Sequence, residues 1–336
     1  MKLSRRRWLA TTAALGSSPV LASGVGEVVV YCALDREFSE PILKRFETET
    51  GVAVRASYDV ESTKSVALAE RLLRERRRPR CDLYWNNEIL NTLRLEKAGV
   101  LAADESKAGE EYPAQWRSPA QRWYGFAARA RVLIVNEKKL AGRTAPSRIE
   151  ELTDPAWKDQ VGIAKPLFGT TATHAACLFA VWGAEKAKAW LSALKANGAR
   201  ILGGNKRVAE EVGAGLLTCG LTDTDDAASE IAAGRSVRQV FLDQEPSGLG
   251  TLVIPNTVAL VEGSPNHDAA RQLREFLLSA EIETALAKSV SRQIPLHPKV
   301  QVADAPRPKR AMVVDFAKAA AAWDDAMSFV KAEFAG

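Results

Sequence analysis

Short apolar runs typical of buried strands alternate with helical segments along the first part of the chain. The runs at 27–33, 52–58 and 81–87 have the pattern of strands, and the segments 38–51 and 62–77 between them have the periodicity of amphipathic helices. Strands that are connected through a helix lie parallel in a sheet whose two faces the helices cover. The sequence therefore predicts an α/β fold with mainly parallel sheets.

A second series of strand and helix patterns follows residue 125. The chain has 336 residues, and the roughly 313 that remain after the N-terminal segment considered next exceed one typical hydrophobic core. Two extended segments, near 125–131 and 248–255, separate the two series. We therefore expect two lobes with helices on both faces of their sheets, joined by these segments, which would act as an interlobe hinge.

Residues 1–23 have the layout of an export signal. Basic residues at the start precede an apolar stretch from about Trp8 to Leu21, and small residues follow at Ala22 and Ser23. The letters "SRRRWL" also resemble a twin-arginine signal, which exports proteins that have already folded. We expect cleavage near Ala22 or Ser23 and a mature protein in the periplasm.

Charge and cysteine spacing exclude several classes of partner. Four of the 46 basic residues and none of the 41 acidic residues lie in 1–23, so the mature chain carries 42 bases and 41 acids. That balance does not favour nucleic acid, and the basic run at 71–80 contains no aromatic residue for base stacking. The four cysteines have no metal-binding spacing, and their apolar neighbours are typical of buried free thiols, but an oxidising compartment also permits a disulfide, so the sequence leaves the state of Cys32, Cys81, Cys177 and Cys219 open.

Polar residues directly follow apolar runs at four places. In open α/β sheets the loops at the carboxyl ends of the strands converge on the ligand. We therefore take as candidate ligand-binding residues those that follow the predicted strands or begin the helix near 170, namely Asp35, Asn87, Glu88, Gly169, Thr170, Thr171, Asp223, Asp225 and Asp226. At each place a helix cap or a solvated turn would also account for the same residues without a ligand.

The stretch "CGLTDTDDA" from Cys219 to Ala227 is the most specific of the four. It holds Asp223, Asp225 and Asp226 with no lysine or arginine beside them in the sequence. Carboxylates this close repel one another, so they must be well solvated or must enclose a cation. Carboxylate oxygens suit a hard cation such as Fe³⁺, or an ammonium group.

An enzyme is not expected. The three histidines lie outside any known catalytic or zinc-binding motif, and no nucleophile motif is present. An exported hydrolase remains the alternative from another functional class, without a catalytic set to support it.

The chain resembles the ferric-ion-binding family of solute-binding proteins that serve ABC importers. The resemblance is strongest in "VVVYCALDREFSEPILKRFETETGVAV", "CDLYWNNE" and "GTLVIPNTVALVEGSPN". It implies a type II periplasmic-binding-protein fold that closes on its ligand, a permease as partner and a monomer without a catalytic cofactor. It also implies a first lobe over 24–125 and about 252–290, and a second over about 126–251 and 291–336.

The family's binding residues are only partly present in this chain. The family's glutamate ligand corresponds to Glu88, and its adjacent tyrosines correspond to Asp225 and Asp226. The resemblance thus implies a metal site at Glu88, Asp225 and Asp226, with Fe³⁺ as the ligand and a synergistic anion at 169–171. The replacement of two phenols by carboxylates leaves open a second ligand, a zwitterion such as an aminophosphonate.

Overall fold

The computed structural model describes residues 26–60 and 64–334, so the predicted export signal over 1–23 lies outside the described residues. Three parallel strands form the first half of the sheet, in which β1 (Glu27–Cys32) pairs with both β2 (Ala53–Tyr58) and β3 (Leu83–Asn86). Helices α1 (Arg36–Thr50) and α2 (Val66–Glu75) connect these strands. This arrangement confirms the predicted strand–helix–strand units.

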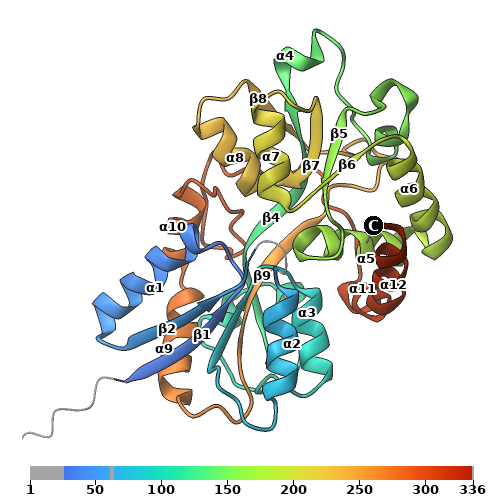
Figure 1. Cartoon of the computed structure of the whole chain (residues 1–336). Helices are drawn as coiled ribbons and strands as arrows, with labels where there is room; N and C mark the ends of the chain where they lie inside the picture. The colour runs from blue at the N-terminus through green and yellow to red at the C-terminus, as the bar shows by residue number, and fades with distance from the viewer. Residues whose placement is uncertain (1–25, 61–63, 335–336) are drawn as a thin grey trace, which may run out of the picture.

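The second half is built in the same way. Strand β5 (Val161–Ala164) lies parallel to β6 (Arg200–Leu202) and β7 (Cys219–Asp223). Strand β8 (Val237–Val240) pairs with the long strand that connects the two halves, which is described next. The helices of this half are α5 (Gly169–Trp182), α6 (Ala184–Ala196), α7 (Asn205–Gly213) and α8 (Thr224–Ala232). Figure 1 shows the two halves as the lower and upper parts of the molecule.

Two long strands connect the halves. Strand β4 (Tyr124–Asn136) is buried along its whole length and pairs antiparallel with β7, β8 and β9 (Val253–Leu260), and β9 also pairs antiparallel with β3. The α/β two-lobe class is therefore confirmed, but the expectation of mainly parallel sheets is wrong. The sheet is mixed, because the connecting strands must run back through both halves.

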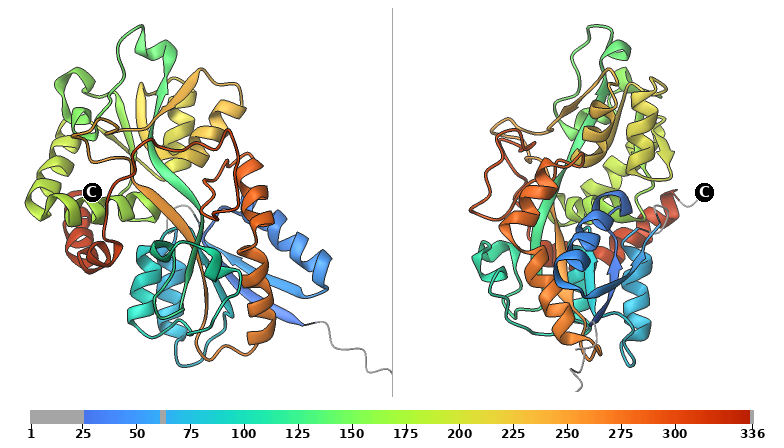
Figure 2. Two further views of the ribbon diagram at one scale, coloured as in Figure 1. Left: turned by 180° about the vertical axis from the view of Figure 1, so that it is seen from behind. Right: turned by 90° about the vertical axis from the view of Figure 1, so that its left-hand side faces the viewer.

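The remaining helices cover the outside of the molecule. They are α3 (Leu90–Lys97), α4 (Glu137–Leu140), α9 (His267–Leu277), α10 (Ala280–Lys288), α11 (Phe316–Ala321) and α12 (Trp323–Phe334). Short 3-10 turns lie at Gly109–Glu111, Ala114–Trp116, Ile149–Thr153 and Pro155–Trp157. Helix α11 packs against both α3 and α5, and so contacts both halves (Figures 1 and 2). Within the described ranges every helix is too short or too polar to span a bilayer.

One apolar cluster extends through both halves, and another lies within the first half. Tyr31, Leu72 and Tyr84 of the first half belong to the same cluster as Ile163, Leu191 and Leu221 of the second. Val28, Phe46 and Leu273 lie in the other cluster of the first half. All four cysteines are buried free thiols, which decides between the two states that the sequence left open.

Candidate functional site

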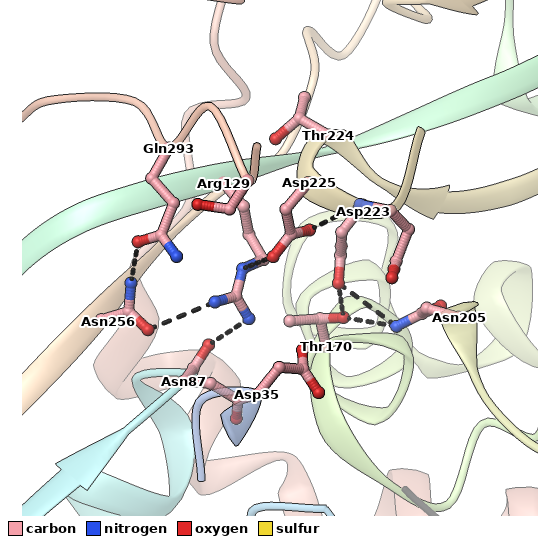
Figure 3. Close-up of polar contacts among 12 residues, drawn as sticks. Asp35, Asn87, Arg129, Thr170, Asn205, Asp223, Thr224, Asp225, Asn256 and Gln293 are labelled. Carbon is pink, nitrogen blue, oxygen red and sulfur yellow. Dashed lines mark hydrogen bonds and ion pairs between the residues drawn. The ribbon is translucent and has the colours of Figure 1, made fainter. Parts of the chain in front are cut away.

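The loops that follow β1, β3 and β7 meet the start of α5 beside strand β4 (Figure 3). Asp35 follows β1, Asn87 follows β3, Thr170 lies in the first turn of α5, and Asp223 ends β7. The predicted convergence of these residues is confirmed, because the carboxyl ends of the strands point to the same region between the two halves.

Two buried arginines on β4 lie among the acidic residues, and the sequence analysis missed them. The Arg129 Nε atom lies 3.3 Å from Asp225 Oδ2, and Arg131 Nη1 lies 2.8 Å from Asp223 Oδ1. Both arginine side chains are at most 2 % exposed. The expectation that no basic group neutralises the aspartates is therefore wrong, because the bases come from a strand about 90 residues away in the sequence.

Arg131 and Asp223 belong to a network with the start of α5. Arg131 Nη1 also donates to Thr170 Oγ1 (3.2 Å) and to Asn205 Oδ1 (3.0 Å), and Thr170 Oγ1 donates to Asp223 Oδ2 at 2.5 Å. Thr171 Oγ1 donates to the same Asn205 oxygen (2.9 Å). Two Arg131 nitrogens, Nε and Nη2, are buried without a hydrogen-bond partner among the described residues. Buried donors without a partner are costly, so an acceptor that reached these two nitrogens would stabilise them.

Arg129 connects the two halves of the molecule. Its Nη1 donates to the carbonyl oxygen of Asn87 and its Nη2 to Asn256 Oδ1, both at 3.2 Å, while its Nε faces Asp225. Asn256 in turn donates to Gln293 Oε1 at 2.9 Å. The buried atoms Asn87 Oδ1 and Gln293 Nε2 have no partner within the described part of the chain. The cluster therefore holds both donors and acceptors that are not yet used (Figure 3).

The three aspartates form a compact carboxylate group. One oxygen of each of Asp223, Asp225 and Asp226 lies within 4.8 Å of the others. Burial raises the pKa of Asp225 to about 6 although Arg129 opposes the shift. Burial, together with Asp225 and Asp223, raises the pKa of Asp226 well above its usual value. Asp226 is half-buried, accepts a hydrogen bond from Thr222 Oγ1 (3.1 Å), and has no ion pair within the described residues. Of the three carboxylates, that of Asp226 is therefore the most available to bind a solute.

Asp35 faces the group from the first half. Its carboxylate lies 2.7 Å from Lys64 Nζ. Burial acts to raise the pKa of Asp35, but Lys64 and Arg129 outweigh that effect, so the pKa lies below its usual value. Asp35 is therefore ionised at neutral pH.

Glu88 has a different environment from the one that the resemblance implied. Its carboxylate is fully buried and accepts from the backbone amides of Leu90 (2.6 Å) and Asn91 (3.0 Å), from Asn86 Nδ2 (2.9 Å) and from Thr173 Oγ1 (2.9 Å). These bonds cap α3 and connect it to α5. Glu88 does not belong to the carboxylate group, so its role as a metal ligand stays a prediction that requires these bonds to open.

The start of α5 is open to a further acceptor. Gly169 has a φ of +54° and donates its amide to the Lys64 carbonyl oxygen, and no side chain caps the helix. Buried Thr170 and Thr171 follow. One turn on, burial and then Arg131 lower the pKa of His174 to about 3, so this ring is neutral at pH 7. A helix start beside the free nitrogens of Arg131 favours an anion.

Comparison with known proteins assigns the family. A family described as bacterial extracellular solute-binding protein matches residues 92–321. The chain belongs to this family. It is 28 % identical over 316 residues to "Iron uptake protein A1" of Synechocystis sp., covering 86 % of each chain. It is 26 % identical to the "Putative 2-aminoethylphosphonate-binding periplasmic protein" of Salmonella typhi, covering 86 % of this chain and 83 % of the relative.

The fold of this solute-binding protein matches known structures over nearly its whole length. Iron-bound HitA from Pseudomonas aeruginosa superposes with a TM-score of 0.81 at 24 % identity, covering 92 % of this chain and 99 % of HitA. The likeness supports the two-lobe fold. Because the family consists of solute-binding proteins, the polar cluster beside β4 is interpreted as a binding site and not as a catalytic centre.

Proposed function

We propose that this protein captures a small charged solute between its two lobes in the periplasm and delivers it to the permease of an ABC importer. The family and the fold support this proposal. We further propose that the protein acts as a monomer and that the twin-arginine-like signal exports it. The lobes would comprise 24–125 with about 252–290, and about 126–251 with 291–336, and they would close about β4 and β9.

The solute would carry both a positive and a negative end. The observation that carries this proposal is that the carboxylate group of Asp223, Asp225 and Asp226 lies beside Arg131, whose Nε and Nη2 have no partner among the described residues. We propose that Asp226, with Asp225, contacts the positive end. Arg131, Thr171 and the start of α5 would contact the negative end.

Ferric iron or another hard cation, accompanied by an anion, is the first candidate. The carboxylate oxygens of the three aspartates are close enough to share one ion, and several relatives are named as iron-binding proteins. The metal would bind Asp225 and Asp226, with Glu88 approaching after it releases its hydrogen bonds. The anion would lie at 169–171 and supply the negative charge that a trivalent ion requires beside two arginines.

A zwitterion such as an aminophosphonate is the second candidate, and a specific observation favours it. Arg129 and Arg131 already pair with Asp225 and Asp223, so Asp226 is the one carboxylate of these three without an ion pair among the described residues. One ammonium group suits one free carboxylate better than a trivalent ion does. A phosphonate suits the two unused Arg131 nitrogens, because guanidinium binds such oxygens in a bidentate manner.

The two candidates can be separated by what the purified protein carries and binds. Native mass spectrometry with elemental analysis of protein from its own periplasm would detect bound iron or an organic mass. Titration calorimetry with ferric citrate and with 2-aminoethylphosphonate would then give the affinities, and X-ray scattering of the same samples should show compaction on binding. Failure of both probes to bind, with no bound species in the native protein, would refute the proposed charge pairing.

A further inference from the structure

An apolar groove lies at the mouth of the cleft between the two halves. Its volume is about 530 Å³, within the roughly 300–1,000 Å³ that is typical of ligand pockets. Helices α1 and α10 form one wall and the turns of α7 and α8 form the other, on the side of the molecule away from α11 (Figure 1). The lining residues are Glu37, Phe38, Pro41, Ile42, Lys206, Ser229, Ala285, Leu286, Ser289 and Val290.

The apolar floor of the groove is formed by buried residues, and its rim is exposed. Ile42 and Leu286 are buried at the base, whereas Pro41 is exposed and Val290 at the end of α10 is 57 % exposed. A large apolar side chain exposed next to a concave apolar surface gains free energy when a ligand covers it. The groove therefore suits an apolar group and not a hydrated ion.

The groove lies next to the charged site, because Ser229 in its wall is three residues from Asp226 on α8 and so lies on the same face of that helix. Ser229 Oγ in its wall donates to the carbonyl oxygen of Asp225 at 3.0 Å. Lys206 in the same wall directly follows Asn205, which bonds to Asp223 Oδ2 at 3.2 Å. A molecule whose charged end is bound at Asp226 would thus have to extend by about one helical turn, roughly 5 Å, to reach the groove wall at Ser229.

The place of the groove favours the solute as its occupant. Lys206 Nζ lies 3.0 Å from Glu37 Oε1, so an ion pair between α7 and α1 spans the two walls. Both side chains are half-exposed, and such a pair is easily broken, so it does not bar entry to the groove. The nearness of the groove to Asp226 is what favours an extension of the solute over a segment of another protein.

We infer that the groove is a subsite for the apolar body of the solute, and that the protein takes a charged solute that carries such a body, of about the size of a phenyl ring. The inference rests on the proposed function, because the charged end of this solute binds at Asp226 and Arg131. It narrows the ligand class to an organic zwitterion with an apolar substituent or to a cation that is bound as an organic chelate.

Two pairs of probes test the inference. Within each pair the charged end is the same and one member carries a phenyl group: 2-aminoethylphosphonate against 1-amino-2-phenylethylphosphonate, and the ferric complex of acetohydroxamate against that of benzohydroxamate. Burying a phenyl group should make the larger member of the binding pair bind at least about tenfold more tightly to the unaltered protein. Val290→Asp should reduce this advantage to about twofold or less, because a charge on the rim opposes the apolar contact.

A matched control keeps the outcome clear. Val313 is 88 % exposed and does not line the groove, so Val313→Asp should leave the tenfold advantage unchanged. If the smaller probe binds but the phenyl member gains nothing, or if the gain survives Val290→Asp, the subsite is refuted while the charge-pair function stands. If no member of either pair binds, the charge-pair function fails and the subsite falls with it. A dimer that Val290→Asp dissociates in sedimentation would instead assign the groove to a second copy.

Discussion

Removal of the Arg131 side chain tests the buried ion pair that the sequence analysis missed. In Arg131→Met the Asp223 carboxylate stays buried and keeps only its hydrogen bonds from Thr170 and Asn205. Breaking one side of a buried pair costs about 3–5 kcal/mol, because the remaining charge is left uncompensated. Since a typical protein has roughly 5–15 kcal/mol in total, the variant should fold but unfold at a much lower urea concentration.

A second substitution separates the charge from the loss of packing. Asn at position 223 is neutral and can still bond to Thr170 and Asn205, so Arg131→Met with Asp223→Asn should recover about 2 kcal/mol or more of the loss.

The assay is urea unfolding followed by the fluorescence of the seven tryptophans that lie outside the predicted export signal. Arg131→Lys is the matched control, since it keeps the charge and loses the planar fork, and it should lie between the parent and Arg131→Met. A loss below about 1 kcal/mol for Arg131→Met, or a double variant whose loss equals the sum of the two single losses, would contradict the reasoning.

Two further predictions concern titratable groups. The pKa of His174 is lowered to about 3, below its unfolded value of about 6.5, so the unfolded chain binds a proton first and stability falls as the pH drops below about 6.5, by about 1.4 kcal/mol per pH unit. His174→Gln should remove this loss of stability at low pH from a plot of unfolding free energy against pH. If the curves of the two proteins run parallel, His174 does not cause the loss. The pKa of Asp226 is raised, so its favourable contribution to stability is present below about pH 4 and is lost as the pH rises through the folded pKa. Asp226→Asn should therefore have a higher melting temperature than the parent at pH 7.5 but not near pH 4. The same variant should lose about 2–4 kcal/mol of solute-binding free energy in titration calorimetry. An unchanged affinity would mean that Asp226 does not contact the solute and is only part of a solvated turn.

The regular elements of the fold could be predicted because each carries its own local pattern. The alternating strands and helices of the first half were read from apolar periodicity, and the convergence of Asp35, Thr170 and Asp223 followed from the rule for strand ends. The mixed sheet was not predicted, because the antiparallel pairing of β4 with β9 depends on contacts over more than 100 residues that leave no local pattern.

The electrostatics of the site were the least predictable part. "FAARARVLIVN" reads as an apolar strand, and the only available signal was that Arg129 and Arg131 interrupt it at alternate positions, both on one face of the strand. Charge balance judged from sequence neighbours left the aspartates without a counterion, whereas their partners come from a different strand. Glu88 was judged from a family position, and its four hydrogen bonds depend on how α3 meets α5.

If the two halves rotate as proposed, the position of α11 limits where they separate. Because this short helix contacts both α3 and α5, it fixes one side of the molecule close to any rotation axis through β4 and β9. Atoms on that side move little when the halves rotate, and displacement grows with distance from the axis. Helix α1, which holds Glu37, lies on the other side of β4 and β9 from α11 (Figure 1), and Glu37 pairs there with Lys206 of the other half, so a small rotation would change this distance more than distances beside α11. A pair of spectroscopic labels near these two residues would therefore measure the rotation with the greatest sensitivity.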